Sequence, residues 1–265
     1  MIYYFSGTGN SFAIAKNIAD KTNDKLYEMV GNDIVKEEIK ANENIGFIFP
    51  VYAWGLPKIV DIFLSSLPPL ENTYYIYAVF TCGDEIGLTD KLFKQKLQEK
   101  GWQVSDVFSV VMRETYICLP GFDIDKEYVE HRKFQTAIEK SNRIAEYINK
   151  RHDSLNDNFK EVNTLDNSNI KLDRGSLPYF KSYVLRSLFN NFLTDDKYFH
   201  VNIQVCTRCG KCVKNCPLKN IRIKNEVPTW NGHCTLCLRC YHACPCHAIE
   251  YGIFTKGKGQ VKINF

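Results

Sequence analysis

Residues 2–21, IYYFSGTGNSFAIAKNIADK, begin with four apolar residues, continue through a glycine-rich turn and end in a stretch with helical spacing. A strand that leads directly into a helix start places backbone N–H groups and the positive end of the helix dipole beside the turn. The turn adds further hydrogen-bond donors from the side chains of Ser6, Thr8, Asn10 and Ser11. This combination predicts a site for a phosphate monoester, with a turn that binds nothing as the alternative.

Two familiar phosphate-binding motifs are excluded by individual positions in this turn. The P-loop requires a lysine directly after its last glycine, and the first lysine after Gly9 is Lys16. The dinucleotide-binding fingerprint requires a third glycine where Phe12 stands. No nicotinamide fingerprint is found elsewhere, so the sequence does not support direct oxidation of a nicotinamide cofactor.

The first 150 residues alternate between strand-like and helix-like patterns. Such alternation predicts an α/β fold with a parallel sheet and helices on both faces. The strand-like runs are apolar throughout, as in strands that are buried on both sides. The five predicted strands cover residues 2–5, 26–30, 45–50, 74–80 and 104–112. The predicted helices cover residues 11–21, 58–66, 90–100 and 125–150.

Two further loops are predicted at the carboxyl ends of strands, where open α/β sheets bind ligands. Residues 50–57 contain Tyr52, Trp54 and Gly55, and residues 81–87 are rich in small and acidic residues. Aromatic rings beside exposed backbone suit a flat heterocycle that is stacked and hydrogen-bonded along its edge. The alternative is that both aromatic side chains belong to the hydrophobic core.

The last quarter of the chain contains nine of its eleven cysteines, eight of them in two copies of one pattern. The pattern is Cys-x-x-Cys-x-x-Cys-x-x-x-Cys-Pro, which is the spacing of bacterial ferredoxins. Three cysteines of each copy are expected to bind one [4Fe–4S] cluster, and the fourth to reach the other cluster. The expected ligand sets are Cys206, Cys209, Cys212 and Cys244 for one cluster, and Cys234, Cys237, Cys240 and Cys216 for the other.

Zinc is the main alternative for these cysteines, because Cys-x-x-Cys pairs also build tetrahedral zinc sites. A zinc site has no use for the third cysteine and the Cys-Pro, so the doubled pattern favours iron–sulfur clusters. Cys246 lies outside the pattern, and with Cys82 and Cys118 it is expected to be a buried thiol without a ligand role. The histidines near the cluster cysteines, His233, His242 and His247, are not expected to be proton donors.

The residues between these two parts form two segments of different composition. Residues 152–175 are polar and predict a linker, whereas residues 177–199 are strongly apolar and predict a helix. This helix is expected to pack between domains, and a membrane-surface or partner-binding helix is the alternative. We therefore predict an N-terminal domain over residues 1–151, a connecting segment over 152–200, and a small α+β two-cluster domain over 201–265.

The composition is that of an ordinary globular protein with 265 residues, 45% hydrophobic and a net charge of +4. No apolar run approaches the ~18 residues of a membrane-spanning helix, and the first residues carry no secretory signal. We therefore expect a cytoplasmic protein whose cysteines serve metal or redox chemistry rather than disulfides. The oligomeric state is left open.

Residues 1–150 resemble a flavodoxin-like FMN domain, with a five-stranded parallel sheet. Joined to the cysteine pattern, the chain resembles the flavodoxin–ferredoxin fusion proteins of anaerobes, called ferrodoxins. The resemblance implies two [4Fe–4S] clusters and one FMN. It implies that the ribityl phosphate is held by Ser6, Thr8, Gly9, Asn10 and Ser11. It implies that the flavin ring contacts two loops, through Tyr52, Ala53, Trp54 and Gly55 and through Thr81, Gly83 and Asp84. Ser6 stands where flavodoxins often have threonine, which keeps the hydroxyl.

The resemblance implies an electron-transfer flavoprotein that couples a low-potential donor such as ferredoxin to an acceptor. The alternatives are a flavin-dependent reductase with a small substrate near residues 116–122 and a redox sensor, which would need an output module that the sequence lacks. Whether the chain is an enzyme therefore stays open. Gly55 is expected to supply a backbone segment that changes conformation on flavin reduction.

The net charge is unevenly distributed between the two halves. Residues 201–265 carry ten lysines and arginines against two acids, which gives +8 and leaves −4 for the rest of the chain. A basic module of this kind could steer an acidic, ferredoxin-like redox partner or dock on the acidic half of its own chain. A small-molecule acceptor is the other possibility, and no element typical of nucleic-acid recognition is present.

Overall fold

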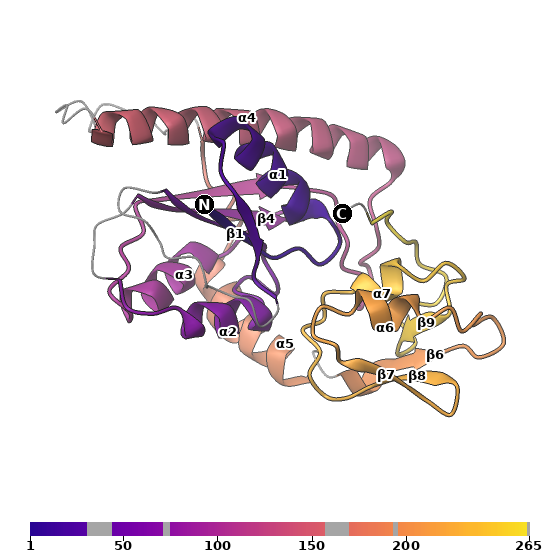
Figure 1. Cartoon of the computed structure of the whole chain (residues 1–265). Helices are drawn as coiled ribbons and strands as arrows, with labels where there is room; N and C mark the ends of the chain where they lie inside the picture. Colours follow the sequence, from indigo (N-terminus) through magenta and orange to yellow (C-terminus); the bar gives the residue numbers. More distant parts are fainter. Residues whose placement is uncertain (31–43, 71–74, 157–169, 193–195, 264–265) are drawn as a thin grey trace.

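The computed structural model describes residues 1–30, 44–70, 75–156, 170–192 and 196–263, without the side chains of 152–156. It consists of an open sheet between helices and a smaller, cysteine-rich module beside one end of that sheet (Figure 1). The N-terminal 156 residues supply the sheet and its helices, and residues 196–263 supply the module. None of the helices described is long and apolar enough to cross a membrane.

The sheet has five strands in the order β2-β1-β3-β4-β5, and every neighbouring pair is parallel. This confirms the predicted α/β fold with a five-stranded parallel sheet. The strands are β1 (Ile2–Tyr4), β2 (Leu26–Glu28), β3 (Ile45–Pro50), β4 (Ile76–Cys82) and β5 (Asp106–Val111). The strand predicted over 74–80 extends to Cys82 instead, because Thr81 and Cys82 pair with Val110 and Val111 of β5.

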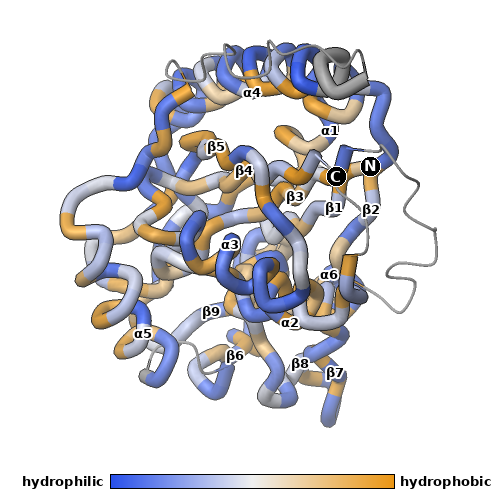
Figure 2. The backbone as a smooth tube through the Cα atoms, turned by 90° about the vertical axis from the view of Figure 1, so that its left-hand side faces the viewer, coloured by the Kyte–Doolittle hydropathy of each residue, from blue (hydrophilic) through white to orange (hydrophobic). Residues whose placement is uncertain are grey.

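Two helices cover each face of the sheet. Helices α1 (Asn10–Thr22) and α4 (Glu127–Asn156) lie on one face, and α2 (Lys58–Ser66) and α3 (Thr89–Gln98) lie on the other (Figure 1). Each pair encloses its own buried core, and Figure 2 shows hydrophobic positions concentrated in the strands between the helix layers. Burial of both faces explains why the strands read as continuous apolar runs.

The cysteine-rich module is built from two short antiparallel strand pairs and two short helices. The strand pairs are β6 (Phe199–Val201) with β9 (Ile249–Tyr251) and β7 (Ile221–Lys224) with β8 (Val227–Trp230). The helices are α6 (Lys211–Asn215) and α7 (Arg239–His242). The core of this module also includes Ile117 and Cys118 from the loop after β5. The two parts of the chain therefore share a hydrophobic contact.

The apolar segment predicted as one helix over 177–199 is divided into several elements. It forms a π-helix (Phe180–Leu185), α5 (Arg186–Phe192), a short 3-10 helix (Asp196–Tyr198) and the start of β6. Its inner side packs on the sheet part, where Ser182 Oγ donates to Trp54 O at 2.9 Å and accepts from Leu88 N at 2.8 Å. The segment therefore contacts the sheet part through Ser182, and its Phe189 side chain packs against the hydrophobic core of the cysteine-rich module.

The polar stretch predicted as a linker over 152–175 lies partly outside the described residues, which omit 157–169. Its last residues are anchored on the sheet part. Asp173 accepts hydrogen bonds from Ser109 Oγ at 2.8 Å and from Lys140 Nζ at 2.9 Å, and its carbonyl accepts from Ile86 N at 2.7 Å. The chain is thus attached to the sheet edge before it enters the π-helix.

Candidate functional site

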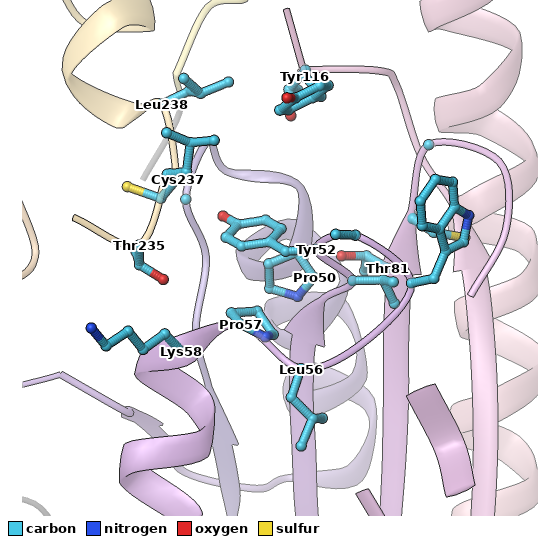
Figure 3. A pocket seen from close by; sticks show the side chains of 18 of the residues that line it. Pro50, Tyr52, Leu56, Pro57, Lys58, Thr81, Tyr116, Thr235, Cys237 and Leu238 are labelled. Carbon is cyan, nitrogen blue, oxygen red and sulfur yellow. The ribbon is translucent and has the colours of Figure 1, made fainter. Parts of the chain in front are cut away.

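A cavity of about 1180 Å³ lies at the carboxyl edge of the sheet, where the sheet part meets the cysteine-rich module. All three loops that the sequence singled out line it, at residues 6–11, 50–57 and 81–85. The remaining wall includes residues of 113–122, of the π-helix and α5, of α2 and α3, and of 232–238 in the module, together with Asp196. Figure 3 shows Tyr52 and Tyr116 projecting into it from different segments, with Cys237 and Leu238 on the module side. The cavity therefore joins the two parts of the chain.

The glycine-rich loop forms the innermost end of this cavity. Gly9 has a φ of 100° and immediately precedes α1, a conformation that glycine adopts without the steric cost of a side chain. Its N–H donates to Ser6 Oγ at 3.1 Å, and the hydroxyls of Ser11 and Thr81 are 2.8 Å apart. The first amides of α1 have no partner within the helix. Buried hydroxyls beside helix-start amides are donors suited to an anion, and the anion site itself stays a prediction.

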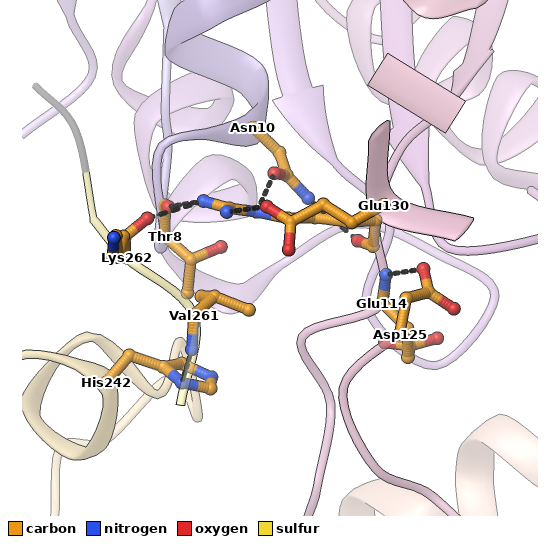
Figure 4. A network of polar contacts seen from close by, with 9 residues as sticks. Thr8, Asn10, Glu114, Asp125, Glu130, His242, Val261 and Lys262 are labelled. Carbon is orange, nitrogen blue, oxygen red and sulfur yellow. Dashed lines mark hydrogen bonds and ion pairs between the residues drawn. The ribbon is translucent and has the colours of Figure 1, made fainter. Parts of the chain in front are cut away.

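Arg113, which the sequence analysis did not single out, supplies a positive charge beside this loop. Figure 4 shows three of its partners, Asn10, Glu130 and Lys262, which come from different segments. Its Nε donates to Asn10 Oδ1 at 3.1 Å, and Asn10 Nδ2 donates to the Arg113 carbonyl at 3.0 Å. The guanidinium also forms an ion pair with Glu130 of α4 and donates to the Lys262 carbonyl at 2.7 Å. Arg113 thereby fixes the Asn10 side chain and attaches the end of the chain to the loop.

A second arginine holds the glycine-rich loop from the outside. Arg239 of α7 donates from Nε to Gly7 O at 3.0 Å and from Nη2 to Ser6 O. In a trans peptide the C=O and the following N–H point in opposite directions. The hydrogen bonds from Arg239 to the Ser6 and Gly7 carbonyls therefore direct the N–H groups of Gly7 and Thr8 away from Arg239, toward the other side of the loop. An arginine of the cysteine-rich module thus orients donors of the anion site.

The Tyr52–Gly55 loop is a tight turn in which two residues have positive φ. Ala53 and Trp54 have φ angles of 46° and 55°, and Tyr52 and Gly55 exchange two backbone hydrogen bonds of 3.1 Å. Left-handed backbone at residues other than glycine costs roughly 1 kcal/mol each, and such strain is concentrated at functional sites. The conformation is maintained by Arg186, which donates to Tyr52 O at 2.7 Å and to Leu56 O at 2.7 Å.

The structure gives the two aromatic residues of this turn different surroundings. Trp54 Nε1 donates to Glu85 Oε1 at 2.6 Å, and Glu85 also pairs with Lys181 at 2.6 Å. Tyr52 instead lies between the glycine-rich loop and the module, and burial raises the pKa of its hydroxyl, with the Cys237 thiol acting in the same direction. Trp54 is thus fixed by a polar partner, whereas the Tyr52 ring lies at the junction.

At Gly7 the glycine-rich loop lies very close to both the Tyr52–Gly55 turn and the cysteine-rich module. A Cβ at this position would lie 2.6 Å from Tyr52 Oη and 2.8 Å from the Cys237 carbonyl oxygen. No side chain fits into that space without moving the backbone of the module. One of the eight predicted cluster ligands is therefore packed directly against the loop that forms the anion site.

The third loop presents two acidic side chains with different environments. Asp84 is 83% exposed and lies at the rim, 3.6 Å from Lys133 Nζ. Glu114, from the loop after β5, lies beside Gly83, and its Oε1 accepts from the backbone amides of Thr115 and Tyr116. Burial raises the pKa of Glu114, although these two hydrogen bonds and Lys133 oppose the shift. Glu114 is thus a half-buried carboxyl of the cavity wall that the sequence analysis missed.

Gly55 does not have a positive φ, the backbone conformation for which glycine would be needed. The Arg186 guanidinium occupies the space where a Cβ of residue 55 would lie. Arg186 holds the carbonyls on both sides of this glycine. The predicted conformational change at Gly55 therefore stays a prediction, and it would require Arg186 to release at least one carbonyl.

The two cysteine runs have the same backbone conformation. Equivalent positions are 28 residues apart, and the positions two and four residues after the first cysteine of each run are left-handed in both copies. The pairs are Arg208 with Leu236, Gly210 with Leu238 and Lys219 with His247, each with φ between 51° and 70°. Five of these six residues are not glycine. Backbone strain repeated at equivalent positions indicates that both loops are suited to the same kind of bound group.

The cysteine sulfurs accept hydrogen bonds from backbone amides. Asn220 N donates to Cys216 Sγ at 3.3 Å, Leu236 N to Cys234 Sγ at 3.3 Å, and Ala248 N to Cys244 Sγ at 3.2 Å. Amide donors directed at sulfur stabilise a thiolate and tune the potential of iron–sulfur clusters.

Several thiols of each predicted ligand set act on one another's pKa, but Cys246, which lies outside both sets, is the thiol that acts on Cys244. Burial raises the pKa of Cys212, and the thiols of Cys244 and Cys206 act in the same direction. Burial also raises the pKa of Cys240, as do three other thiols of its predicted set, Cys237, Cys234 and Cys216. Cys212 acts on Cys240 as well, so the two groups adjoin. Cys209 is exposed.

All eleven cysteines are free, and no disulfide is present. Within the described ranges, no three His, Cys, Asp or Glu side chains are arranged to hold a single metal ion. The thiolates around a four-iron cluster stand further apart than those around one ion, so that arrangement does not describe a cluster site.

The remaining cysteines and histidines do not join these groups. Cys82 and Cys118 are buried, and burial raises the pKa of Cys118 to about 12. Cys246 is half-buried, so the expectation of a buried thiol is wrong for it, and its Sγ lies 3.8 Å from Cys244 Sγ. His242 accepts from Val261 N at 3.3 Å and bonds to Thr115 O at 2.9 Å, and burial lowers its pKa to about 4. His242 therefore connects α7 to two other segments as a neutral side chain.

Residues 1–112 match the family model of a flavodoxin domain. This match covers the glycine-rich loop and both flanking loops, and it supports a flavin cofactor in the cavity and a flavin-based redox function. No curated protein sequence matches this chain.

Two solved structures are similar to part of the chain. The Trp repressor binding protein from Bacillus subtilis shares 13% identity with a TM-score of 0.37, over 52% of this chain and 94% of that one. A flavoprotein from Bacteroides uniformis, titled as putative, shares 17% identity with a TM-score of 0.31, over 42% of this chain and 90% of that one.

Proposed function

We propose that this protein is an electron-transfer iron–sulfur flavoprotein that carries FMN in the cavity and two [4Fe–4S] clusters in the cysteine-rich module. The observation that carries the proposal is the position of Cys237. This predicted cluster ligand lines the flavin cavity and packs against Gly7 of the anion loop and against Tyr52. A cluster on Cys237 would therefore lie next to a flavin in the cavity.

The residues around the cavity fit FMN. Backbone amides of residues 7–11 and the hydroxyls of Ser6, Thr8 and Ser11 would hold its phosphate, with Arg113 and Arg239 placing these donors. Tyr52 would lie against the flavin ring, while Thr81 and Gly83 would line its edge; Gly55 does not itself line the cavity. Asp84 would stay at the rim, because it is exposed. When bound, the flavin supplies exchange between two-electron and one-electron chemistry.

The cysteines fit two clusters in the crossed arrangement. Cys206, Cys209, Cys212 and Cys244 would hold the outer cluster, and Cys234, Cys237, Cys240 and Cys216 would hold the inner one. The support for this assignment is the repeated loop conformation, the amides directed at three sulfurs and the grouping of the thiols. In this arrangement Cys209 reaches the surface and Cys237 reaches the flavin cavity, so the ligands define an outer and an inner end.

The test of this proposal is the order of the reaction between the clusters and the flavin. The anaerobic holoprotein is reduced by a rapid light pulse with a deazaflavin, and the cluster and flavin absorbances are followed. We expect electrons to redistribute between clusters and flavin at a rate that does not depend on protein concentration. A rate proportional to concentration would show that the two groups do not communicate within one chain, contrary to the proposal.

A second candidate function is the reduction of a small molecule at the flavin. The cavity of about 1180 Å³ exceeds the ~300–1,000 Å³ of ordinary ligand pockets, and its wall includes the Glu114 carboxyl, whose pKa is raised by burial. A carboxyl in this position could exchange a proton with a small substrate bound beside the flavin. A screen of small electron acceptors in the presence of excess reduced protein separates the candidates, since a carrier reduces them slowly and without saturation.

A further inference from the structure

The repeat in the cysteine-rich module gives each residue of the flavin-facing loop an equivalent in the other loop. With the offset of 28 residues, Cys237 corresponds to Cys209 and Arg239 to Lys211. Both loops have the same left-handed positions and lead into a short helix, α7 in one copy and α6 in the other. The two loops therefore present the same surface with different side chains.

In the second copy this surface is an interface inside the chain. Cys237 packs on Gly7 and Tyr52, and Arg239 donates to the carbonyls of Ser6 and Gly7. The Arg239 side chain is only 11% exposed. One cysteine and one basic residue, two positions apart, thus dock the module on its internal redox partner.

In the first copy the equivalent surface is open to solvent. Cys209 is exposed, as are Lys211 and Lys214 of α6. Exposed apolar side chains lie in the same loop, with Ile203 at 61% and Val205 at 44%. A small apolar area with a basic border around a cluster ligand has the features of a transient protein interface.

An ion pair extends this surface onto the neighbouring strand pair. Arg208 and Glu226 are 2.6 Å apart and connect the Cys209 loop to the turn between β7 and β8. That turn also carries Lys224, which is exposed. We call the surface formed by Ile203, Val205, Arg208, Lys211, Lys214 and Lys224 the Cys209 face.

We propose that the Cys209 face docks a small acidic protein that carries one electron at a time, and that Lys211 performs there the role that Arg239 performs inside the chain. This inference rests on the proposed function. Residues 201–265 carry +8, and two clusters of charge about −2 each leave the module positive. An acidic partner would therefore be attracted to it. In the transfer, the partner loses one electron and the outer cluster gains it, with no bond formed and no proton moved.

The experiment uses the full-length holoprotein and compares two double variants with the same change in charge. Lys211→Glu with Lys214→Glu alters the Cys209 face, and Arg132→Glu with Arg143→Glu alters exposed positions of α4, which covers the far side of the sheet (Figure 1). The electron donors are a reduced acidic bacterial ferredoxin and, separately, dithionite. Stopped-flow absorbance gives the second-order rate constant of cluster reduction as a function of ionic strength.

We expect the Lys211/Lys214 variant to react with the ferredoxin about tenfold or more slowly at low ionic strength, with the difference shrinking as salt is added. The Arg132/Arg143 variant should stay within about twofold of the parent, and dithionite should reduce all three proteins alike. Equal losses in both variants would overturn the proposal, since only net charge would then matter. So would an unchanged rate.

The outcome is separable from that of the proposed function. Iron, sulfide and flavin are determined on every preparation before the kinetics. A protein without clusters or flavin contradicts the proposed function itself. If the protein contains both cofactors and is reduced by dithionite, but its Lys211/Lys214 variant reacts with ferredoxin like the parent, only the docking surface is contradicted.

Discussion

Replacing Arg239 with alanine is expected to weaken the binding of FMN, although Arg239 belongs to the cysteine-rich module. The side chain holds the carbonyls of Ser6 and Gly7 from outside the anion loop, with Nε 3.0 Å from Gly7 O. Because the peptide groups are trans, this contact orients the N–H groups of Gly7 and Thr8 toward the opposite side. Without it, the two peptides can rotate, and the phosphate loses preorganised donors.

The size of the effect follows from the contacts that are lost. A hydrogen bond from a charged group contributes about 1.5–3 kcal/mol, and Arg239 makes two such bonds while being only 11% exposed. Part of this energy stabilises the docking of the module rather than the loop. We therefore expect the free energy of FMN binding to weaken by about 1.5–3 kcal/mol, which corresponds to a roughly 10- to 150-fold larger dissociation constant.

The assay is a fluorescence titration of the flavin-free protein with FMN and, separately, with riboflavin, which has no phosphate. Arg239→Ala should weaken FMN binding and leave riboflavin binding within about twofold, because only the phosphate contacts the affected amides. Arg222→Ala, which removes a charge from an exposed position of β7, is the matched control and should change neither. Equal weakening for FMN and riboflavin would refute the reasoning, because the loss would then lie in the ring site or in the fold.

Three further predictions concern other parts of the site. Burial raises the pKa of Glu114, so the Glu114 carboxyl contributes to stability below its ordinary pKa, and this contribution is lost as the pH rises. The melting temperature of Glu114→Gln relative to the parent should therefore increase from pH 5 to pH 8. A constant difference between the two melting temperatures would contradict this. Cys237→Ser should lose about four of about eight iron atoms, whereas Cys246→Ser should keep all of them; equal iron contents would remove Cys237 from the ligand set. Arg186→Gln frees the carbonyls of Tyr52 and Leu56 and should change the separation between the two one-electron potentials of bound flavin, as measured by potentiometry; unchanged potentials would exclude a role for this clamp.

The sheet could be predicted from the sequence because its determinants are local. Apolar runs such as Ile45–Pro50 mark strands that are buried on both sides, and the strand–turn–helix at residues 2–21 indicates an anion site at a helix start. The ends of the strands were less predictable. β4 continues to Cys82 because β5 pairs with it there, which is a contact between distant segments.

The flanking loops were located from the sequence, but the residues that hold them were not. Arg113, Arg186 and Arg239 act mainly on backbone carbonyls or on one amide side chain, from positions more than 100 residues away in the chain. Single arginines with such roles leave no periodic or spaced pattern. The only available signal was the repeat, which aligns Arg239 with Lys211 and so marks both as equivalent positions.

The cysteine spacing, in contrast, is a local pattern that can be interpreted from the sequence alone. Three ligands at intervals of three residues require a tight loop, and the left-handed positions at Arg208 and Leu236 show how each loop is turned. The segment over 177–199 was predicted as one helix because its apolar residues continue without a break. Its change from π-helix to α5 lies at Arg186, which donates hydrogen bonds to the Tyr52 turn about 130 residues earlier.

The most direct test of the account is the cofactor content of the protein purified without oxygen. Iron, acid-labile sulfide, zinc and flavin are quantified on one sample, together with its absorbance spectrum before and after reduction. The account predicts about eight iron atoms, about eight sulfides and one FMN per chain, with cluster absorbance that bleaches on reduction. Zinc in place of iron, or a protein that binds iron but no flavin, would contradict it.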